Sequence, residues 1–279
     1  MAKKIKGISN GVNKFLLETL KDEGKRLKIP SHKDRALIRE YLQTKIIYYL
    51  YNFSLSKRIS FIGGTSLRIL RDLDRFSEDL DFDNLGLNFF QVRDLFFKIK
   101  GTLKREGFDI EYKMKKTNES GIGEMKFKNL LFELGISFHR KENLVIKLNY
   151  TTPKTRPKPE TLILNRFGLV QNVVTNKSEF LLSQKMRAIL TRRDPQPRDF
   201  YDVVWFLSHR INPDKKLFRE MKIKNEEELY TKLESIYSGK IKPKIKSFKK
   251  RLAPFLIDEK KVYYLDIFPK ILKKELLAK

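Results

Sequence analysis

The chain has 279 residues, 41% hydrophobic and 12% aromatic, which is enough apolar surface for a buried core and excludes an intrinsically disordered chain. It contains no cysteine, which excludes disulfides, thiolate catalysis and cysteine-based zinc sites. The 60 Lys and Arg residues against 34 Asp and Glu give a formal net charge of +26, which favours a polyanionic partner such as nucleic acid.

The positive charge is concentrated at the two ends of the sequence. Residues 1–60 carry 14 basic and 5 acidic side chains, residues 61–150 carry 16 and 14, and residues 151–279 carry 30 and 15. A nearly neutral middle between cationic flanks suits an acidic catalytic centre beside a basic surface. Lysine-rich surfaces also occur for solubility or heat stability, so charge alone does not identify the partner.

No segment has the character of a membrane span or an export signal. The longest apolar stretch, residues 46–53, is far shorter than the roughly 18 residues that cross a bilayer. The basic residues at positions 3–6 are not followed by an apolar signal region. We therefore expect a cytoplasmic protein with no membrane partner.

Helical and strand patterns alternate through the first half of the sequence. Apolar residues at three- and four-residue spacing predict helices, and two-residue alternation predicts strands. The predicted helices cover residues 33–54, 65–73 and 88–105, and the predicted strands cover 58–62, 79–83, 108–113, 124–127, 130–138 and 144–150. Together they predict a mixed α/β sheet with helices.

The second half of the sequence is mainly helical. A stretch with three prolines and three basic residues, 152–159, predicts an exposed connection, and a hairpin follows over 161–175. We place a domain boundary there, between residues 1–175 and 176–279. The predicted helices of the second domain cover residues 177–192, 198–209, 213–237 and 241–278.

The strand over 58–62 ends at a glycine pair. A strand that turns into a helix through Gly63 and Gly64 can bring backbone N–H groups close to a phosphate, with the Thr65 and Ser66 hydroxyls as further donors. No Gly-Lys-Ser/Thr follows, so an ATPase-type phosphate loop is not predicted. A plain tight turn would give the same pattern.

Two aspartates at positions 79 and 81 are the strongest metal-site candidates. Carboxylates two residues apart on a strand project from one face and can hold a divalent cation such as Mg²⁺, which prefers oxygen ligands. Leu80 and Phe82 between and after them indicate that the other face is buried. The alternative is an edge strand with a solvated acidic face.

These residues form the core of a family resemblance. The runs Gly63–Leu67 and Arg75–Phe82 closely resemble the first motif of the AbiEii/AbiGii toxin-type (MenT-like) nucleotidyltransferases, which belong to the DNA polymerase β-like superfamily. Later motifs of the family resemble Ile146–Asn149, Lys185–Arg192 and Arg198–Asp202, in the same order and spacing. The resemblance covers residues 63–202, half of the chain.

The resemblance implies a fold and an activity. The fold is a polymerase β-like mixed sheet with helices, followed by a mainly helical C-terminal region that completes the active site. The implied activity uses Mg²⁺ or Mn²⁺ to transfer a nucleotide from a nucleoside triphosphate to a hydroxyl acceptor, with release of pyrophosphate. In related toxins the acceptor is the tRNA 3′ end, so the resemblance also implies an RNA partner, a toxin role and a separately encoded antitoxin.

The resemblance also assigns roles to individual residues. Asp79 and Asp81 would hold the metal and act in catalysis with Lys185, Asp199 and Asp202. The expected nucleotide-binding residues are Gly63, Gly64, Thr65, Ser66, Ser77, Lys147 and Arg192. Lys185 and Arg192 lie on one face of a predicted helix, where a solvated basic face is the alternative. Asp199 and Asp202 share a face of the next helix, where acids near a helix N-terminus are favoured by the helix dipole alone.

One position departs from the family pattern. Asn149 stands where many members carry the third carboxylate, and an amide cannot act as a base. Asp199, Asp202 or Glu133 could take that role, or the site could work with fewer metal contacts. Two other classes remain open: a small-molecule or protein nucleotidyltransferase, and a non-enzymatic basic module that binds nucleic acid.

Overall fold

The computed structural model describes the backbone of residues 5–277 and the side chains of residues 16–277. The lysines at positions 3 and 4, and residue 278 of the last predicted helix, lie outside this part. The chain divides into two compact units. The first comprises Met1–Asp72, Phe76–Pro153 and Thr161–Thr175, and the second comprises Leu73–Arg75, Lys154–Glu160 and Asn176–Lys279.

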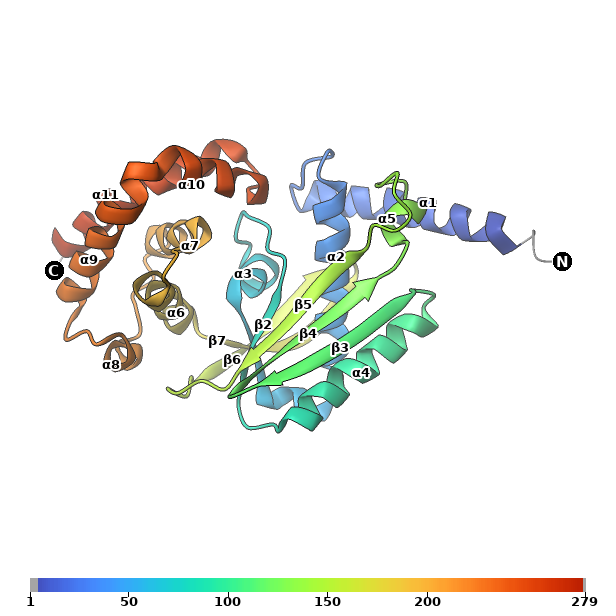
Figure 1. The fold of residues 1–279 in the computed structure, drawn as a ribbon, viewed down its shortest axis with the longest axis horizontal. Coiled ribbons are helices and arrows are strands. Elements are labelled where there is room, and N and C mark those ends of the chain that lie inside the picture. Colours follow the sequence, from blue (N-terminus) through green and yellow to red (C-terminus); the bar gives the residue numbers. More distant parts are fainter. Residues whose placement is uncertain (1–4, 278–279) are drawn as a thin grey trace. The chain divides into compact units, whose positions relative to one another are not determined.

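A seven-stranded mixed sheet forms the centre of the first unit (Figure 1). Its strands are β1 (Ile59–Ile62), β2 (Leu80–Asn84), β3 (Ile110–Thr117), β4 (Ser120–Phe127), β5 (Leu144–Thr151), β6 (Pro159–Arg166) and β7 (Leu169–Asn176), in the order β3-β4-β5-β2-β1-β7-β6. Strand β2 pairs antiparallel with β1 and parallel with β5, while β3, β4 and β5 are antiparallel. The expected mixed α/β class is confirmed.

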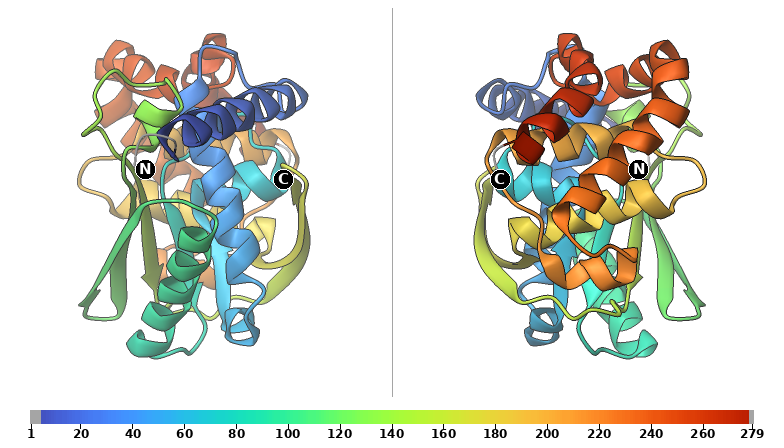
Figure 2. Two further views of the ribbon diagram at one scale, coloured as in Figure 1. Left: turned by 90° about the vertical axis from the view of Figure 1, so that its right-hand side faces the viewer. Right: turned by 90° about the vertical axis from the view of Figure 1, so that its left-hand side faces the viewer.

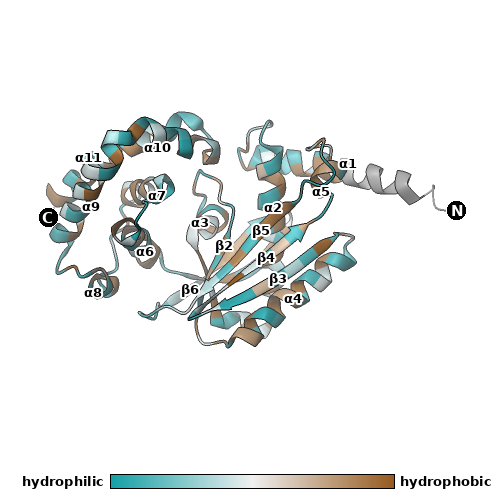
Figure 3. Cartoon of the chain, in the orientation of Figure 1, coloured by the Kyte–Doolittle hydropathy of each residue, from teal (hydrophilic) through white to brown (hydrophobic). Residues whose placement is uncertain are grey.

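Helices cover one face of this sheet. The first unit contains α1 (Ile5–Arg26), α2 (Asp34–Leu50), α3 (Gly63–Arg71), α4 (Phe89–Arg105) and α5 (Leu130–Glu133). Along β4 and β5 every second residue is buried, so each strand has one buried and one open face. Figure 3 shows hydrophilic and hydrophobic residues in both strands. Phe82 of β2 lies 5.6 Å, ring centre to ring centre, from both Phe61 of β1 and Phe96 of α4. The core therefore lies between the sheet and α2 and α4.

The second unit is helical, as Figure 2 shows. It contains α6 (Ser178–Thr191), α7 (Pro197–Ser208), α8 (Phe218–Met221), α9 (Glu226–Ile236), α10 (Ile245–Leu252) and α11 (Tyr264–Leu277). Helix α7 packs on α6 and α11, with Phe200 4.9 Å from Phe268 and Tyr201 stacked 5.0 Å from Tyr264. No helix of the described part of the chain is long and apolar enough to cross a membrane.

The second half is mainly helical, as expected, but the structure differs from three of the predicted elements. The strand predicted over 130–138 is the short helix α5 followed by a turn. Its bounds are set by left-handed backbone at Asn129 and Gly135, and burial of Leu130, Leu131 and Leu134 follows helical rather than strand spacing. The helices predicted over 213–237 and 241–278 are each interrupted, the second by residues 253–263, which include Pro254.

Candidate functional site

The glycine turn between β1 and α3 lies directly against an aspartate. Gly63 has a φ of +76°, which favours glycine, and it begins α3 immediately after β1. A Cβ atom at Gly63 would lie 2.5 Å from Asp81 Oδ2. Ile62 is also the strand partner of Asp81. The Asp81 carboxylate therefore lies against the N-terminus of α3, where backbone N–H groups have no partner within the helix.

Asp79 lies directly before β2, and Asp81 is the second residue of this strand. Leu80 and Phe82 are buried in the core, so strand alternation places the two aspartates on the other face. The Thr65 hydroxyl donates to the Asp79 carbonyl, and the Ser66 hydroxyl donates to the Gly63 carbonyl over 3.0 Å. Both hydroxyls are buried, and their protons fix the turn in place.

Asn149 contacts Asp81 from the neighbouring strand. The two residues are strand partners in the parallel β2–β5 pair, and Asn149 Nδ2 donates to Asp81 Oδ1 over 3.0 Å. The amide orients the carboxylate without neutralising it. Among the described residues no group of three His, Cys, Asp or Glu side chains is arranged to hold a metal ion. The acidic part of this site is thus a pair of aspartates with an amide beside it.

The segment before β2 is fastened to α2. Gln43 Nε2 donates to the carbonyls of Ser77 and Glu78 over 3.1 and 2.9 Å. Ser77 thus contributes its backbone to the support of Asp79. Lys147 is exposed on β5, two residues before Asn149 and on the same face of the sheet.

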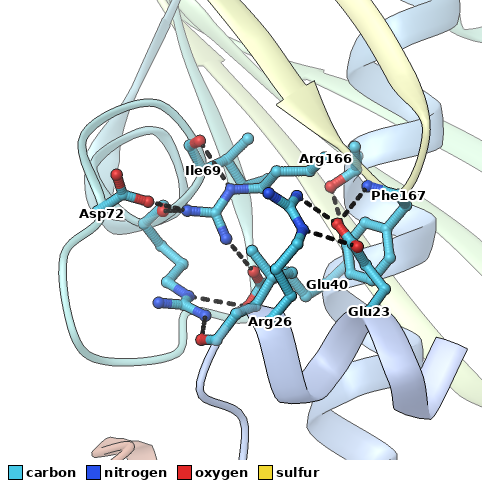
Figure 4. Close-up of polar contacts among 10 residues, drawn as sticks. Glu23, Arg26, Glu40, Ile69, Asp72, Arg166 and Phe167 are labelled. Atoms are coloured by element: carbon cyan, nitrogen blue, oxygen red, sulfur yellow. Dashed lines mark hydrogen bonds and ion pairs between the residues drawn. The ribbon is translucent and has the colours of Figure 1, made fainter.

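A buried ionic cluster holds α3 against α2 and β6 (Figure 4). Glu40 of α2 accepts from Arg68 of α3 and from Arg166 of β6, each over 2.9 Å. Arg166 also donates to the Ile69 and Arg68 carbonyls over 2.9 and 2.8 Å, and to the Asp72 carboxylate. The Glu40, Arg68 and Arg166 side chains are each at most 5% exposed. This cluster, which the sequence analysis missed, fixes the direction of the helix that begins at Gly63.

A second acidic cluster joins α6 and α7 inside the second unit. Lys185 Nζ of α6 lies 3.1 Å from Asp199 Oδ1 and 2.9 Å from Asp202 Oδ2. Arg75 pairs with Asp202 through two bonds of 2.6 Å each. Arg192 Nη1 lies 2.6 Å from Asp199 Oδ2. The arrangement is therefore a chain of alternating charges, Arg75–Asp202–Lys185–Asp199–Arg192.

The charges in this chain control one another's protonation. Burial would raise the pKa of Asp202, but the Arg75 and Lys185 charges outweigh it and hold the pKa below its ordinary value. Burial would likewise lower the pKa of Lys185, yet the Asp202 and Asp199 carboxylates hold it above its ordinary value. Asp202 is fully buried, whereas the Arg192 side chain at the other end is 49% exposed. This series of ion pairs therefore extends from the buried interior at Asp202 to the solvent at Arg192.

Arg75 was the residue of this cluster that the sequence analysis left without a role. It comes from the Leu73–Arg75 segment, whose Asp74 accepts from the Tyr201 hydroxyl over 2.7 Å and pairs with Lys261. A signal was present, because a buried arginine inside a sequence motif needs an acidic partner. The resemblance supplied Asp199 and Asp202, but sequence alone gave no reason to choose between them.

The structure brings the predicted residues together in two groups, one in each unit. In the first unit Asp81 lies beside Gly63 and Asn149. In the second unit Lys185, Arg192, Asp199 and Asp202 form the ionic chain. Glu133, offered as a replacement for the third carboxylate, lies on helix α5 rather than on a sheet strand.

Comparison with protein families identifies the class that this fold and site define, a nucleotidyltransferase. Residues 45–270 match the family model described as "Nucleotidyl transferase AbiEii toxin, Type IV TA system". The chain belongs to this family of nucleotidyltransferase toxins from type IV toxin–antitoxin systems, which confirms the resemblance found in the sequence. The search among curated proteins gives no match.

Two solved structures from Helicobacter pylori support the fold. JHP933 from Helicobacter pylori is 20% identical, with a TM-score of 0.54 over 88% of this chain and 94% of that chain. A putative nucleotidyltransferase from H. pylori is also 20% identical, with a TM-score of 0.55 over 88% of this chain and 97% of that chain. The nucleotidyltransferase toxin MenT4 from Mycobacterium tuberculosis is 19% identical, with a TM-score of 0.49 over 76% and 70% of the two chains.

Proposed function

We propose that this nucleotidyltransferase uses Mg²⁺ or Mn²⁺ to transfer a nucleotide from a nucleoside triphosphate to a hydroxyl of an RNA, such as the 3′ end of tRNA. The acceptor oxygen bonds to the α-phosphorus, the bond from the α-phosphorus to the β-phosphate oxygen breaks, and pyrophosphate leaves. The hydroxyl proton passes to a carboxylate or to water. The observation that carries the proposal is the Asp81 carboxylate held against the Gly63 turn by the Asn149 amide.

The residues around Asp81 fit a divalent cation. Asp79 and Asp81 supply carboxylate oxygens and Asn149 an amide oxygen, and hard cations prefer oxygen ligands. Within the described residues no cation pairs with Asp81, so its charge is available to a metal. Bound there, Mg²⁺ would neutralise phosphate charge and polarise the reacting phosphorus. We propose that the site works with two acids, with the Asn149 amide in the place of the third.

The phosphates of the triphosphate need hydrogen-bond donors that the folded protein already holds in place. The backbone N–H groups of Gly63 and Gly64 at the start of α3 are such donors, since the residue before the helix provides no side-chain cap. The Thr65 and Ser66 side chains support this turn. The exposed Lys147 adds a cation on the same face of the sheet as Asp81.

We propose different roles for the acids of the second unit. Asp202 has both oxygens engaged by Arg75 and Lys185 and acts as a structural anchor. Asp199 orients Lys185 and Arg192, whose charges would neutralise the triphosphate. A phosphate competes with Asp199 for Arg192 most readily, because that side chain is half exposed.

The acceptor and the partner follow from charge and family. A net charge of +26 favours a long polyanion over a small sugar or aminoglycoside. Membership of a toxin–antitoxin family supports a cognate antitoxin protein as a second partner.

Incubation of the protein with each labelled nucleoside triphosphate, Mg²⁺ and total tRNA tests the proposal. We expect label in RNA from at least one triphosphate, lost with EDTA and lost in Asp81→Asn. Equal labelling by wild type and the Asp81→Asn variant would contradict it. Label in protein or in a small molecule, but not in RNA, would favour the other nucleotidyltransferase classes. RNA binding without any transfer would favour a non-enzymatic module.

A further inference from the structure

The open face of β3, β4 and β5 leads from Asp81 to a lysine-rich edge of the sheet. Asp81 of β2 is the strand partner of Asn149, Asn149 is the partner of Ile122 in β4, and Ile122 is the partner of Lys115 in β3. Directly paired residues project from the same face of a sheet. These four side chains therefore form one row across four strands, about 14 Å long at the usual spacing between strands.

This face of the first unit is not covered by its helices. Helices α2 and α4 lie on one side of β3, β4 and β5 in the left view of Figure 2, and in Figure 1 no helix is drawn in front of these strands. The opposite faces of β4 and β5 are buried. Ile122 is 50% exposed although it occupies the middle of the row. Ile122 is therefore an exposed apolar contact between Asp81 and Lys115 in this row.

The strand partners on either side of this row add cations and hydroxyls to the same face of the sheet. On one side, Lys147 is exposed and Lys113 pairs with Glu124 over 2.9 Å. On the other side, Thr117 and Ser120 form a pair of hydroxyls 2.6 Å apart, next to Thr151. Lys115 forms no ion pair with any residue that the structure describes. The face thus offers two exposed lysines that form no ion pair with the described residues, Lys115 and Lys147, together with hydroxyls and one exposed apolar side chain, and such groups can contact the backbone and sugars of a nucleic-acid strand.

We infer that this row is the track on which the acceptor end of the RNA lies, with its terminal hydroxyl directed toward Asp81. The inference rests on the proposed function and assigns its acceptor to a surface. Lys115 contacts the phosphates of the RNA backbone at the β3 edge of the sheet. Ile122 contacts a base or ribose of the RNA closer to Asp81. A protein occupant such as the antitoxin is the competing possibility.

Two adjacent lysines provide a matched test of direction. Lys115 and Lys116 are neighbours on β3, and strand alternation directs them to opposite faces. Lys115→Glu and Lys116→Glu change the net charge equally, so only contact with the face distinguishes them. Ile122→Ser has its own control in Ile163→Ser, because Ile163 is 67% exposed on β6 at the other edge of the sheet.

The experiment measures filter binding of labelled tRNA to the full-length protein in EDTA, so that no transfer takes place. We expect Lys115→Glu and Ile122→Ser each to raise the Kd for tRNA about tenfold, and Lys116→Glu and Ile163→Ser to change it by less than about threefold. Thermal unfolding of all four variants checks that each is folded. In the labelling assay, Lys115→Glu should raise the KM for tRNA while the KM for the triphosphate stays within about twofold.

Several outcomes would overturn the inference. Equal losses in Lys115→Glu and Lys116→Glu would indicate general electrostatic attraction, and no loss in either, or no tRNA binding by wild type, would exclude the track. Unchanged tRNA binding together with lost capture of the antitoxin would assign the face to a protein. If wild type labels tRNA but Lys115→Glu leaves its KM unchanged, the track fails and the proposed function stands. If wild type transfers nothing but binding falls only in Lys115→Glu and Ile122→Ser, the track stands and the proposed function fails.

Discussion

The two acidic clusters of the molecule contain the same chemical group in opposite electrostatic settings. Asp81 of the first unit lies against a glycine turn and accepts a hydrogen bond from a neutral amide. Asp202 of the second unit is fully buried between Arg75 and Lys185. One carboxylate has its charge directed at a helix N-terminus, and the other has its charge neutralised by two side chains.

The difference shows how to separate a functional acid from a structural one. A buried carboxylate between two cations is already neutralised, and loss of its charge leaves those buried cations without the carboxylate that they share. Neutralising a carboxylate that lies beside an amide and a helix N-terminus costs little stability but removes its attraction for a cation. Stability and activity should therefore respond in opposite ways at the two sites.

The largest expected effect is at Asp81. Asp81→Asn keeps the shape of the side chain but removes its charge, so we expect nucleotide transfer to fall about a thousandfold, since a metal supplies several kcal/mol. The free energy of unfolding should change by less than about 1 kcal/mol. Initial rates of label transfer and urea unfolding of the same preparation provide the two measurements. A large loss of stability in Asp81→Asn would contradict the view that Asp81 is a functional acid and Asp202 a structural one.

Asp202→Asn should have the reverse effect. It leaves Arg75 and Lys185 buried without their shared carboxylate, so we expect unfolding to become easier by about 3–5 kcal/mol. Asp194→Asn is the control, because Asp194 is an exposed acid of the same unit that pairs with Arg251 at 3.6 Å and should contribute less than about 1 kcal/mol. Similar urea midpoints for the two variants would show that the buried pair is not an anchor.

Gly63→Ala tests whether Asp81 must lie against the glycine turn for nucleotide transfer. Gly63 and Gly168 both have positive φ angles, +76° and +71°, so alanine strains the backbone at both positions by about 1 kcal/mol. Only at Gly63 would the new Cβ meet a neighbour, Asp81 Oδ2 at 2.5 Å, whereas at Gly168 nothing lies within 4 Å. We expect transfer to fall at least about tenfold in Gly63→Ala and to stay near wild type in Gly168→Ala. Equal rates would mean that Asp81 does not need its place beside the turn.

The smallest effect is the dependence of stability on pH. The pKa of Asp202 is lower in the folded protein than in the unfolded chain, so its contribution is fully present above about pH 4 and is lost as the pH falls through the folded value. The pKa of Lys185 is raised, so its contribution is lost only as the pH rises above about 10. Wild type should lose up to about 1.4 kcal/mol per pH unit below pH 4 from this one proton. Asp202→Asn should lack that part of the slope in urea unfolding at pH 2–5.

Local patterns predicted the parts of the site that depend on neighbouring residues. The strand, glycine turn and helix over Ile59–Arg71 and the alternation at Asp79–Phe82 are encoded within a few residues. Partners distant in the sequence were not predictable from such patterns. Arg75 and Asp202 are 127 positions apart, and Glu40 and Arg166 are 126 apart.

Two strand errors have local physical causes. Leu130, Phe132 and Leu134 alternate as in a strand, but left-handed backbone on either side leaves room only for a short helix. The start of β4 was missed because Gly121 has no strand propensity. Its place is explained by Tyr150 of the adjacent strand, whose ring would lie 2.3 Å from a Cβ at that position.

The membership of Leu73–Arg75 in the second unit has a consequence for fragments of this protein. These three residues are synthesised about a hundred positions before Asn176. The second unit therefore includes a short segment from the first half of the sequence, and that segment contains Arg75. A gene cut at residue 175 would separate Asp202 from its guanidinium partner. Neither fragment would then hold a complete set of its own contacts, although co-expression of the two could restore them by complementation.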